Sequence, residues 1–152
     1  MKKKRIIAVT AVVVLISIAG FFAKKYFFPG DSDRIRRTLG LVCSSVEKKE
    51  TGRFLKQFTL DYRDDFNNTY GSLFMLAREH FKNYRNISVK LSQIEITIDG
   101  KEAEARFFAE VSAVSSESDE VFKDAGRLFA KLKKEDFKWK VCYIGGIEDM
   151  FD

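Results

Sequence analysis

The stretch NISVKLSQIEITIDGKEAEARFFAEVSAV, residues 86–114, decides the fold. Apolar residues alternate along it with a period of two, which is the pattern of β-strands that bury one face. Asp99-Gly100 lies between its halves and is a strong signal for a hairpin turn. The alternation slips by one residue at Ser92-Gln93, and a β-bulge there would keep the same face buried. The stretch therefore predicts a long antiparallel hairpin with a bulge in its first strand.

The chain after this hairpin predicts a second one. Two more alternating segments, 127–133 and 137–144, follow an acidic, serine-rich loop. A turn between them sets Leu132 opposite Trp139 and creates an apolar row on one face, which specifies the register.

The chain before residue 86 has the 3.6-residue period of amphipathic helices. We expect helices over about 34–50, around Phe54, and from an Asn68 or Thr69 cap to about Tyr84, with a short strand at 58–62. Helices on one face of an antiparallel sheet form a two-layer α+β domain. The predicted fold class is α+β, with three N-terminal helices packed on a curved antiparallel sheet of four to six strands and preceded by one transmembrane helix.

The net charge of +5 comes from the N-terminal segment. The chain has 27 Lys and Arg against 22 Asp and Glu, and a pI near 9.2. Residues 1–25 contain six of the basic residues and no acidic one, so the rest of the chain has a net charge of −1. Because the basic excess is confined to this segment, we expect no nucleic acid partner.

The same segment predicts a membrane anchor. Ile6 to Ala23 is an 18-residue run interrupted only by Thr10 and Ser17, and a spanning helix needs about 17–25 apolar residues. More basic residues precede the run than follow it, so the positive-inside rule places Met1 in the cytoplasm. The alternative is a signal peptide cleaved after Ser17-Ile18-Ala19.

Both alternatives place the remaining chain outside the cytoplasm. The expected location is the cell membrane, with a single pass, a cytoplasmic N-terminus and an extracytoplasmic domain that is periplasmic where the envelope has two membranes. The expected domains are a cytoplasmic tail and anchor (or uncleaved signal) over 1–25, a linker over 26–33, and a folded domain over 34–152.

The order of elements resembles the nuclear transport factor 2-like superfamily. The resemblance covers about 31–147 and rests on the third helix leading into Ile87–Ile98, the Asp99-Gly100 hairpin, and the closing strand FKWKV at 137–141. It implies a cone-shaped α+β domain with a pocket between sheet and helices. Because the superfamily is diverse, the fold alone does not define a function.

The resemblance also implies candidate site residues, because enzymes of this superfamily use Asp and His in the cone. The weak catalytic candidates are Asp61 and His80, the only histidine. The expected pocket residues are Tyr62, Trp139 and Tyr143. A histidine can act as a general base near neutral pH, but nothing in the sequence pairs His80 with a second group. It is also typical of a residue at the edge of a helix stripe.

Motifs for nucleotides, nucleophiles and metals are missing. The sequence has no G-x-S-x-G, no P-loop, no G-x-G-x-x-G, no C-x-x-C and no H-E-x-x-H. We therefore predict no cofactor and no metal site.

Two further groups of residues have open interpretations. Cys43 and Cys142 are candidates for a disulfide, which an extracytoplasmic location permits, but the predicted register puts them on different sides of the sheet. Four lysines lie opposite the Trp139 face. They either contact phospholipid headgroups or an acidic partner, or are neutralised by Glu102, Glu104 and Glu110 on a neighbouring strand. These lysines are Lys131, Lys133, Lys138 and Lys140.

The first functional hypothesis is a membrane-anchored, extracytoplasmic binding or assembly module without catalytic activity. Its partners would be the membrane, envelope proteins and a small apolar ligand. One alternative is a small-molecule isomerase, cyclase or dehydratase that uses the cone pocket. Another is a dimeric ligand-binding domain, because this fold often pairs through its sheet. The sequence favours a protein that is not an enzyme, since it lacks a catalytic set.

Overall fold

The computed structural model describes residues 29–147. The tail and anchor predicted over 1–25 and the first part of the linker lie outside the described residues. Within 29–147, no helix has the length and apolar character that crossing a membrane requires.

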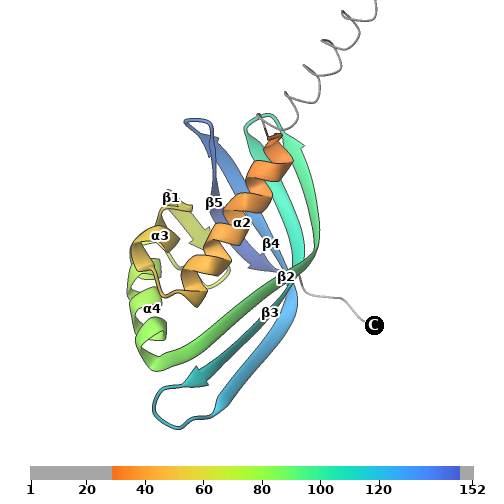
Figure 1. The fold of residues 1–152 in the computed structure, drawn as a ribbon. Coiled ribbons are helices and arrows are strands. Elements are labelled where there is room, and N and C mark those ends of the chain that lie inside the picture. The colour runs from red at the N-terminus through yellow and green to blue at the C-terminus, as the bar shows by residue number, and fades with distance from the viewer. Residues whose placement is uncertain (1–28, 148–152) are drawn as a thin grey trace, which may run out of the picture. The chain divides into compact units, whose positions relative to one another are not determined.

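The described chain forms helices and strands in the order that the sequence predicts, and the fold class is α+β (Figure 1). The five strands form one sheet in the order β1-β5-β4-β3-β2. The β2–β3, β3–β4 and β4–β5 pairs are antiparallel, whereas the β1–β5 pair is parallel. The elements are α2 (Asp31–Glu47), α3 (Thr51–Leu55), β1 (Phe58–Asp64), α4 (Tyr70–Asn83), β2 (Tyr84–Asp99), β3 (Glu102–Ser115), β4 (Val121–Glu135) and β5 (Lys138–Gly146).

The parallel β1–β5 pair departs from the expected antiparallel sheet. A parallel pair requires a crossover connection rather than a hairpin. Here α4 and three strands lie between β1 and β5 in the chain, so β1 joins the far edge of the sheet. The sequence pattern of the predicted strand 58–62 does not specify this pairing, because it does not indicate which strand lies beside it.

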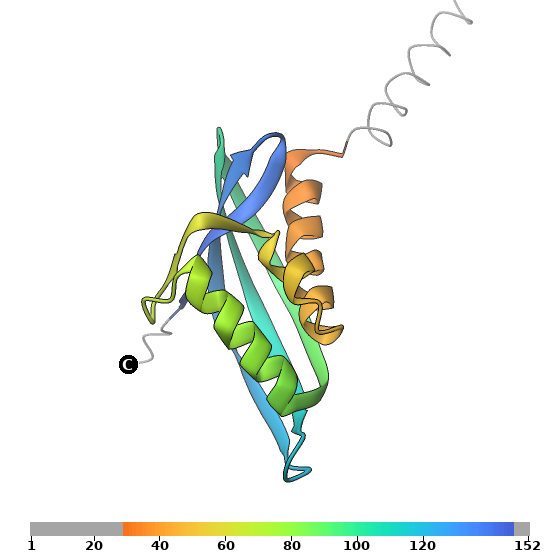
Figure 2. The ribbon, with the colours of Figure 1, turned by 90° about the vertical axis from the view of Figure 1, so that its left-hand side faces the viewer.

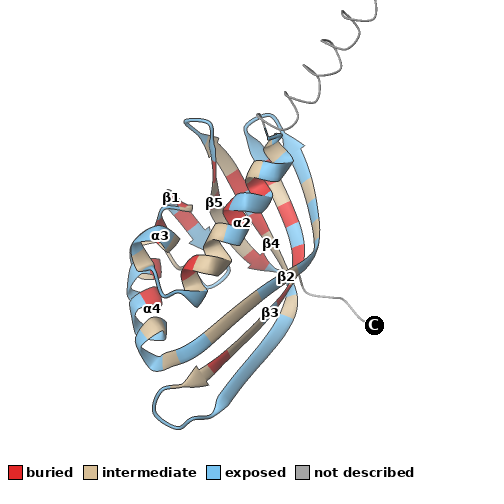
Figure 3. Ribbon diagram, in the orientation of Figure 1, coloured by how far each residue is buried: buried red, intermediate tan, exposed pale blue. Residues whose placement is uncertain are grey.

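The helices cover one face of the curved sheet (Figure 2). The buried residues gather where α2 crosses the middle of the sheet (Figure 3). Ile35 and Leu39 of α2 belong to one core cluster with Ala105 and Ala130 of the central strands. These alanines are completely buried, and their small side chains leave room for the apolar residues of the helix.

Hydrogen bonds to the sheet fix α2 along its length. The Thr38 hydroxyl donates to the Trp139 carbonyl over 3.0 Å in a buried position. The Arg36 guanidinium donates to the Ile94 carbonyl over 3.1 Å, and the Glu47 carboxylate accepts from the Val89 amide over 2.9 Å. The helix therefore contacts both β5 and β2, on opposite sides of the sheet order.

The β2–β3 hairpin confirms the prediction from the opening stretch. The register shifts between Ser92 and Glu95, and Gln93 has the positive φ of 52°, so a bulge absorbs the slip in phase. Asp99 pairs with Glu102, and the turn residues are therefore Gly100 and Lys101, one position later than the dipeptide suggests. Gly100 has a φ of 58°, which glycine adopts without steric cost.

The predicted register of the last hairpin is wrong by two residues. Glu135 pairs with Lys138, so the turn is Asp136-Phe137, and both turn residues have positive φ. Positive φ at both central positions is the geometry of the tight turns that match strand twist. Leu132 consequently faces Val141 instead of Trp139. A shift of two leaves these residues on the predicted face, because side chains alternate with the same period.

A bulge then changes the faces further along β5. Lys131 pairs with Tyr143 while Leu132 pairs with Val141, so Cys142 is the extra residue of the bulge. Its thiol lies 3.3 Å from the Lys131 carbonyl oxygen. The bulge moves Tyr143 to the face opposite Val141, where its ring stacks on Phe129 with centroids 5.8 Å apart.

Leu132→Ala is expected to lower the free energy of unfolding by about 2–5 kcal/mol. Leu132 is only 1% exposed in the core, and truncation there loses transfer free energy and leaves a cavity. Leu60→Ala is the matched control, because Leu60 is 81% exposed and surface truncations change stability by about 0.5 kcal/mol or less. Urea unfolding measures both variants, and equal losses would contradict the described core.

Candidate functional site

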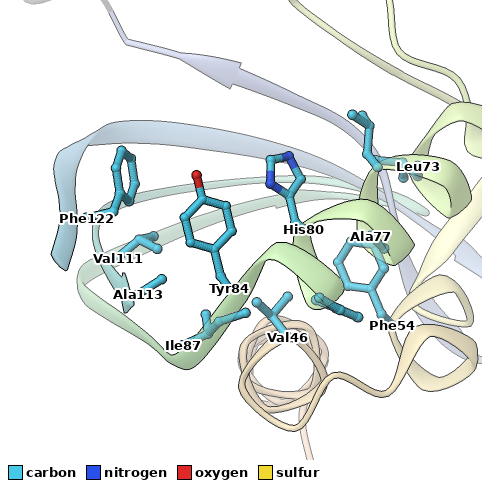
Figure 4. Close-up of a pocket in the computed structure, with 12 residues that line it drawn as sticks. Val46, Phe54, Leu73, Ala77, His80, Tyr84, Ile87, Val111, Ala113 and Phe122 are labelled. Carbon is cyan, nitrogen blue, oxygen red and sulfur yellow. The ribbon is translucent and has the colours of Figure 1, made fainter. Parts of the chain in front are cut away.

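An apolar pocket lies between the three helices and the sheet (Figure 4). Its volume is about 300 Å³. The helices contribute residues from α2, α3 and α4, and the sheet contributes residues from β2, β3 and β4. The lining residues are Val46, Phe54, Leu73, Leu76, Ala77, His80, Phe81, Tyr84, Ile87, Val111, Ala113 and Phe122.

Helix α4 positions the largest share of this lining. Thr69 caps the helix, because its hydroxyl accepts from the Ser72 amide over 3.2 Å and the Ser72 hydroxyl accepts from the Thr69 amide over 2.6 Å. This capping box satisfies two amides at the helix start. Leu73, Ala77 and His80 then follow at helical spacing and face the pocket.

The sheet side of the pocket combines one small residue with larger ones. Ala113 of β3 lies opposite Phe122 of β4, and the Phe122 ring lies at the edge of the pocket, 48% exposed. Phe54 closes another side, where its ring contacts Phe81 edge-on with centroids 6.4 Å apart.

His80 and Tyr84 have the only polar side chains among the residues that line this pocket. Their rings stack with centroids 5.9 Å apart and an interplanar angle of 25°, and Tyr84 also contacts Phe122 at 6.2 Å. The structure thus places the predicted candidate His80 at the pocket, beside a phenol. No carboxylate lines the pocket, so its polar chemistry is limited to one imidazole and one hydroxyl.

Asp61, the other catalytic candidate, lies away from the pocket. It is exposed on β1, and its carboxylate accepts from the Lys133 ammonium over 2.7 Å. This hydrogen bond lowers the pKa of Asp61. The group is therefore ionised at neutral pH and paired on the surface.

The three expected pocket residues also lie elsewhere. Tyr62 is buried in the core, where its ring contacts Phe58 edge-on at 5.1 Å and its hydroxyl lies 3.4 Å from Asp64. Burial, followed by the Asp64 charge, raises the pKa of Tyr62. Trp139 is buried against α2 and lines a different hollow. Tyr143 lies on the other face because of the bulge at Cys142.

Two neighbouring carboxylates, Asp64 and Asp65, form hydrogen bonds that hold the turn after β1. Asp64 accepts from the amides of Phe66 and Asn68 over 2.9 and 2.8 Å, which is the side-chain bonding of an Asx turn. Asp65 accepts from the Tyr143 hydroxyl and the Gly146 amide. These hydrogen bonds lower the pKa of Asp65 and tie the turn to the end of β5.

Comparison with solved structures identifies the architecture. A nuclear transport factor 2 superfamily protein from Salmonella enterica superposes with a TM-score of 0.67 at 16% identity, covering 78% of this chain and 92% of that one. A protein from Novosphingobium aromaticivorans that is proposed to be a scytalone dehydratase superposes with a TM-score of 0.71 at 17% identity, covering 76% and 81%. The chain has the nuclear transport factor 2-like fold.

A second Novosphingobium aromaticivorans protein, proposed to be an aromatic ring hydroxylase, superposes with a TM-score of 0.69 at 18% identity over 76% of this chain and 88% of that one. Searches against family profiles and against curated proteins find no match. At these identities the likeness concerns the nuclear transport factor 2-like fold, and the site must be judged from its own residues.

The sequence located the pocket only in part. It singled out His80, at the edge of the apolar stripe of the helix predicted to end near Tyr84. It did not bring that stripe together with Val46, Ile87 and Phe122, which come from three other elements. The alanines of β3 do not locate the pocket, because Ala103, Ala105 and Ala109 belong to the core cluster and only Ala113 lines the pocket.

The four lysines predicted to form one face have separate surroundings. Lys133 pairs with Asp61 and Lys140 pairs with Glu135 over 3.2 Å. Lys131 lies over the rings of Phe129 and Tyr143 at 6.0 and 5.7 Å. Glu104 and Glu102 are the β3 residues directly opposite Lys131 and Lys133, which supports neutralisation for these two. Lys138 and Lys140 line the hollow that contains Trp139.

Cys43 and Cys142, the two cysteines considered for a disulfide, are free thiols in the structure. Cys43 is on α2, whereas Cys142 lies in the β5 bulge, bonded to the Lys131 carbonyl and lining a surface hollow with Lys133. Among residues 29–147 there is also no group of three or more His, Cys, Asp or Glu side chains that could hold a metal ion.

Cys43 is expected to react slowly with iodoacetamide. Burial, and then the Glu47 charge, raises the pKa of Cys43 from 9.0 to about 11, and only the thiolate reacts. In a Cys142→Ser variant, the alkylation rate should rise about tenfold per pH unit through pH 10 without reaching a plateau. A plateau near pH 9 would contradict the burial.

The same shift has a consequence for stability. A raised thiol pKa means that the folded state holds its proton where the unfolded state has lost it. The contribution of Cys43 to the free energy of unfolding is therefore complete below pH 9, and it is lost as the pH rises toward 11.

Proposed function

We propose that the chain is a membrane-anchored, extracytoplasmic module that binds a small apolar ligand in the pocket between its helices and sheet and does not transform it. The observation that carries the proposal is the pocket lining, in which every side chain is apolar except His80 and Tyr84. Ligand sites of proteins are mostly apolar with a few polar groups that fix orientation.

The size of the pocket limits the ligand. About 300 Å³ is at the lower end of the range for small-molecule sites, which is about 300–1,000 Å³. Apolar surface that is removed from water contributes about 25 cal/mol per Å² to the free energy of binding. A ring or a short hydrocarbon therefore gains the most binding free energy from this lining. The imidazole and the phenol can each hydrogen-bond one polar end of such a molecule.

The arrangement of carboxylates favours binding over catalysis. General acid–base chemistry requires a proton donor and acceptor within reach of one substrate. Asp61 is paired with Lys133 on the surface, Asp64 accepts from the Asn68 amide in the turn after β1, and Asp65 accepts from the Gly146 amide at the end of β5. His80 and Tyr84 therefore have no carboxylate partner in the pocket.

The anchor and the location are the part of the proposal that rests on the sequence. The apolar run Ile6–Ala23 with its basic flanks supports a single span with the N-terminus in the cytoplasm. The pocket would then face a compartment outside the cytoplasm, where envelope proteins are the available partners.

A neutral carbene probe tests both parts in one experiment. Membranes containing the full chain are photolabelled with trifluoromethyl-phenyldiazirine, and the labelled residues are mapped by peptide mass spectrometry. We expect label in the 6–23 segment and in the α4 peptide around Leu76 and His80. Ala113→Phe should reduce the labelling of the α4 peptide at least tenfold, because the new ring fills the pocket. The labelling of the 6–23 segment should not change.

Ala125→Phe is the matched control, because Ala125 is an exposed residue of β4 outside the pocket lining. Thermal unfolding of both variants identifies any loss of folding, and Val46→Phe provides a second filling variant from α2. Label that persists in both filling variants would refute the pocket. Absence of label in 6–23 would refute the anchor alone.

The second candidate is an isomerase, cyclase or dehydratase, and the position of His80 beside Tyr84 in the pocket favours it. A neighbour in fold is proposed to be a scytalone dehydratase. Under this alternative, small molecules extracted with the purified chain would be converted on incubation, and His80→Gln would abolish conversion while retaining the α4 label. No conversion by the unaltered chain would refute this candidate.

A further inference from the structure

A second hollow, of about 380 Å³, lies between the start of α2, the chain after α3, and the β4–β5 turn. Five of its lining residues are cationic, and none is acidic. Trp139 and Phe137 supply aromatic surface to it. The lining residues are Arg34, Arg37, Thr38, Leu41, Lys56, Gln57, Phe137, Lys138, Trp139 and Lys140.

The hollow exists because β5 has an uncovered edge at its start. Strand β1 begins to pair with β5 only at Val141, whose amide donates to the Gln57 carbonyl over 2.8 Å. Residues 138–140 before it have α2 beside them instead, joined by the Thr38–Trp139 hydrogen bond. The buried Trp139 side chain is therefore part of the lining, with basic side chains contributed by three segments.

The positive charge of this hollow is not matched within the part of the chain that the structure describes. Lys140 pairs with Glu135 over 3.2 Å, but Arg34, Arg37 and Lys138 have no carboxylate within ion-pair distance among residues 29–147. Asp31 and Asp33 precede the arginines in the first turn of α2, but neither lines the hollow. A bound anion would relieve the repulsion among the basic residues that do.

We propose that this hollow binds the phosphate of an anionic phospholipid headgroup in the membrane that carries the chain. Arginine and lysine are the side chains that bind phosphate through charge-assisted hydrogen bonds. The aromatic and aliphatic lining suits the part of the lipid next to the phosphate.

The position of the hollow favours a lipid over a free phosphate. The first turns of α2 and the β4–β5 turn lie at the same end of the sheet in both views (Figures 1 and 2). Phe137, at the tip of that turn, is 83% exposed, and aromatic residues favour the membrane interface. Only seven residues, 24–30, lie between the predicted anchor segment and Asp31, and the eight steps of chain from Ala23 to Asp31 span at most about 28 Å.

The inference rests on the proposed anchor and is independent of the apolar ligand. Val46 lines the apolar pocket at the far end of α2, whereas Arg34 and Arg37 line the basic hollow near its start. A rise of 1.5 Å per residue separates Arg34 from Val46 by about 18 Å along the helix. Binding at the two sites can therefore be measured separately.

The test is calorimetric titration of the full chain in a neutral detergent. The ligands are dihexanoyl phosphatidylglycerol, dihexanoyl phosphatidylcholine and sodium phosphate. We expect phosphatidylglycerol to bind and to change the fluorescence of Trp139, the only tryptophan of the chain. The triple variant Arg37→Gln, Lys56→Gln, Lys138→Gln should bind on the order of 100-fold more weakly, because each basic residue near an anionic surface contributes about fivefold.

The matched control removes three charges elsewhere, as Lys82→Gln, Lys90→Gln, Lys123→Gln, and should keep the affinity of the unaltered chain. Circular dichroism verifies that both triple variants are folded. Equal binding of the two lipids, or an equal loss in the control, would overturn the proposal. If sodium phosphate binds as tightly as phosphatidylglycerol, the assignment of the bound phosphate to a membrane lipid is overturned, and the ligand is a soluble phosphate. Each of these failures would leave the carbene labelling of the apolar pocket unchanged.

Discussion

Helix α2 lies across the sheet, and the other features of the domain depend on how it is held there. Ile35 and Leu39 insert above the alanines of β3 and β4, while Thr38 bonds the backbone of β5 and Glu47 bonds the backbone of β2. These contacts join strands that are not neighbours, so the helix helps to hold the sheet in its curved form. The two hollows lie at opposite ends of the same helix.

The apolar pocket follows from this arrangement, because α2 covers the middle of the sheet and leaves the ends of β2, β3 and β4 to α4. At that end Ala113 pairs with Phe122, and both residues line the pocket. His80 and Tyr84 then lie at the junction of α4 and β2, where a helix ends and a strand begins without a loop. The pocket is thus a consequence of packing, with two polar groups at its edge.

The bulge in β5 has a comparable effect on the surface. One extra residue, Cys142, divides the strand into two parts that expose different faces. Before the bulge, Lys138 and Lys140 lie beside α2, and after it Tyr143 lies with Lys131 and Asp65. Lys133 and Lys140 lie directly opposite each other before the bulge, whereas Lys131 lies opposite Tyr143 after it. Of these lysines, only those beside α2 share a hollow with arginines.

Much of the fold could be predicted because its signals are local. The period of two over residues 87–113, the slip at Gln93 and the Thr69 cap each depend on neighbours in the chain, and each is present in the structure. The register of the last hairpin was wrong because two turns, centred one residue apart, shift each pairing partner by two residues and bury the same face. The pocket was recognised only through His80 and the α4 stripe, since its other walls come from Val46 and Phe122, which are distant in sequence.

The sequence by itself determined the α+β class, the order of the elements, the bulged hairpin, the basic excess before residue 26 and the apolar run that predicts an anchor. Each of these follows from spacing and composition within a short stretch. Only the tertiary structure decided that β1 joins β5 in parallel, that Asp61 pairs with Lys133 away from the pocket, and that Arg34 and Arg37 line one hollow with Lys138. Such contacts depend on where distant segments are brought together by burial, and hydrophobic burial is not directional. A pattern of residues therefore tells which face is buried, and the packing of α2 on the sheet decides what that face meets.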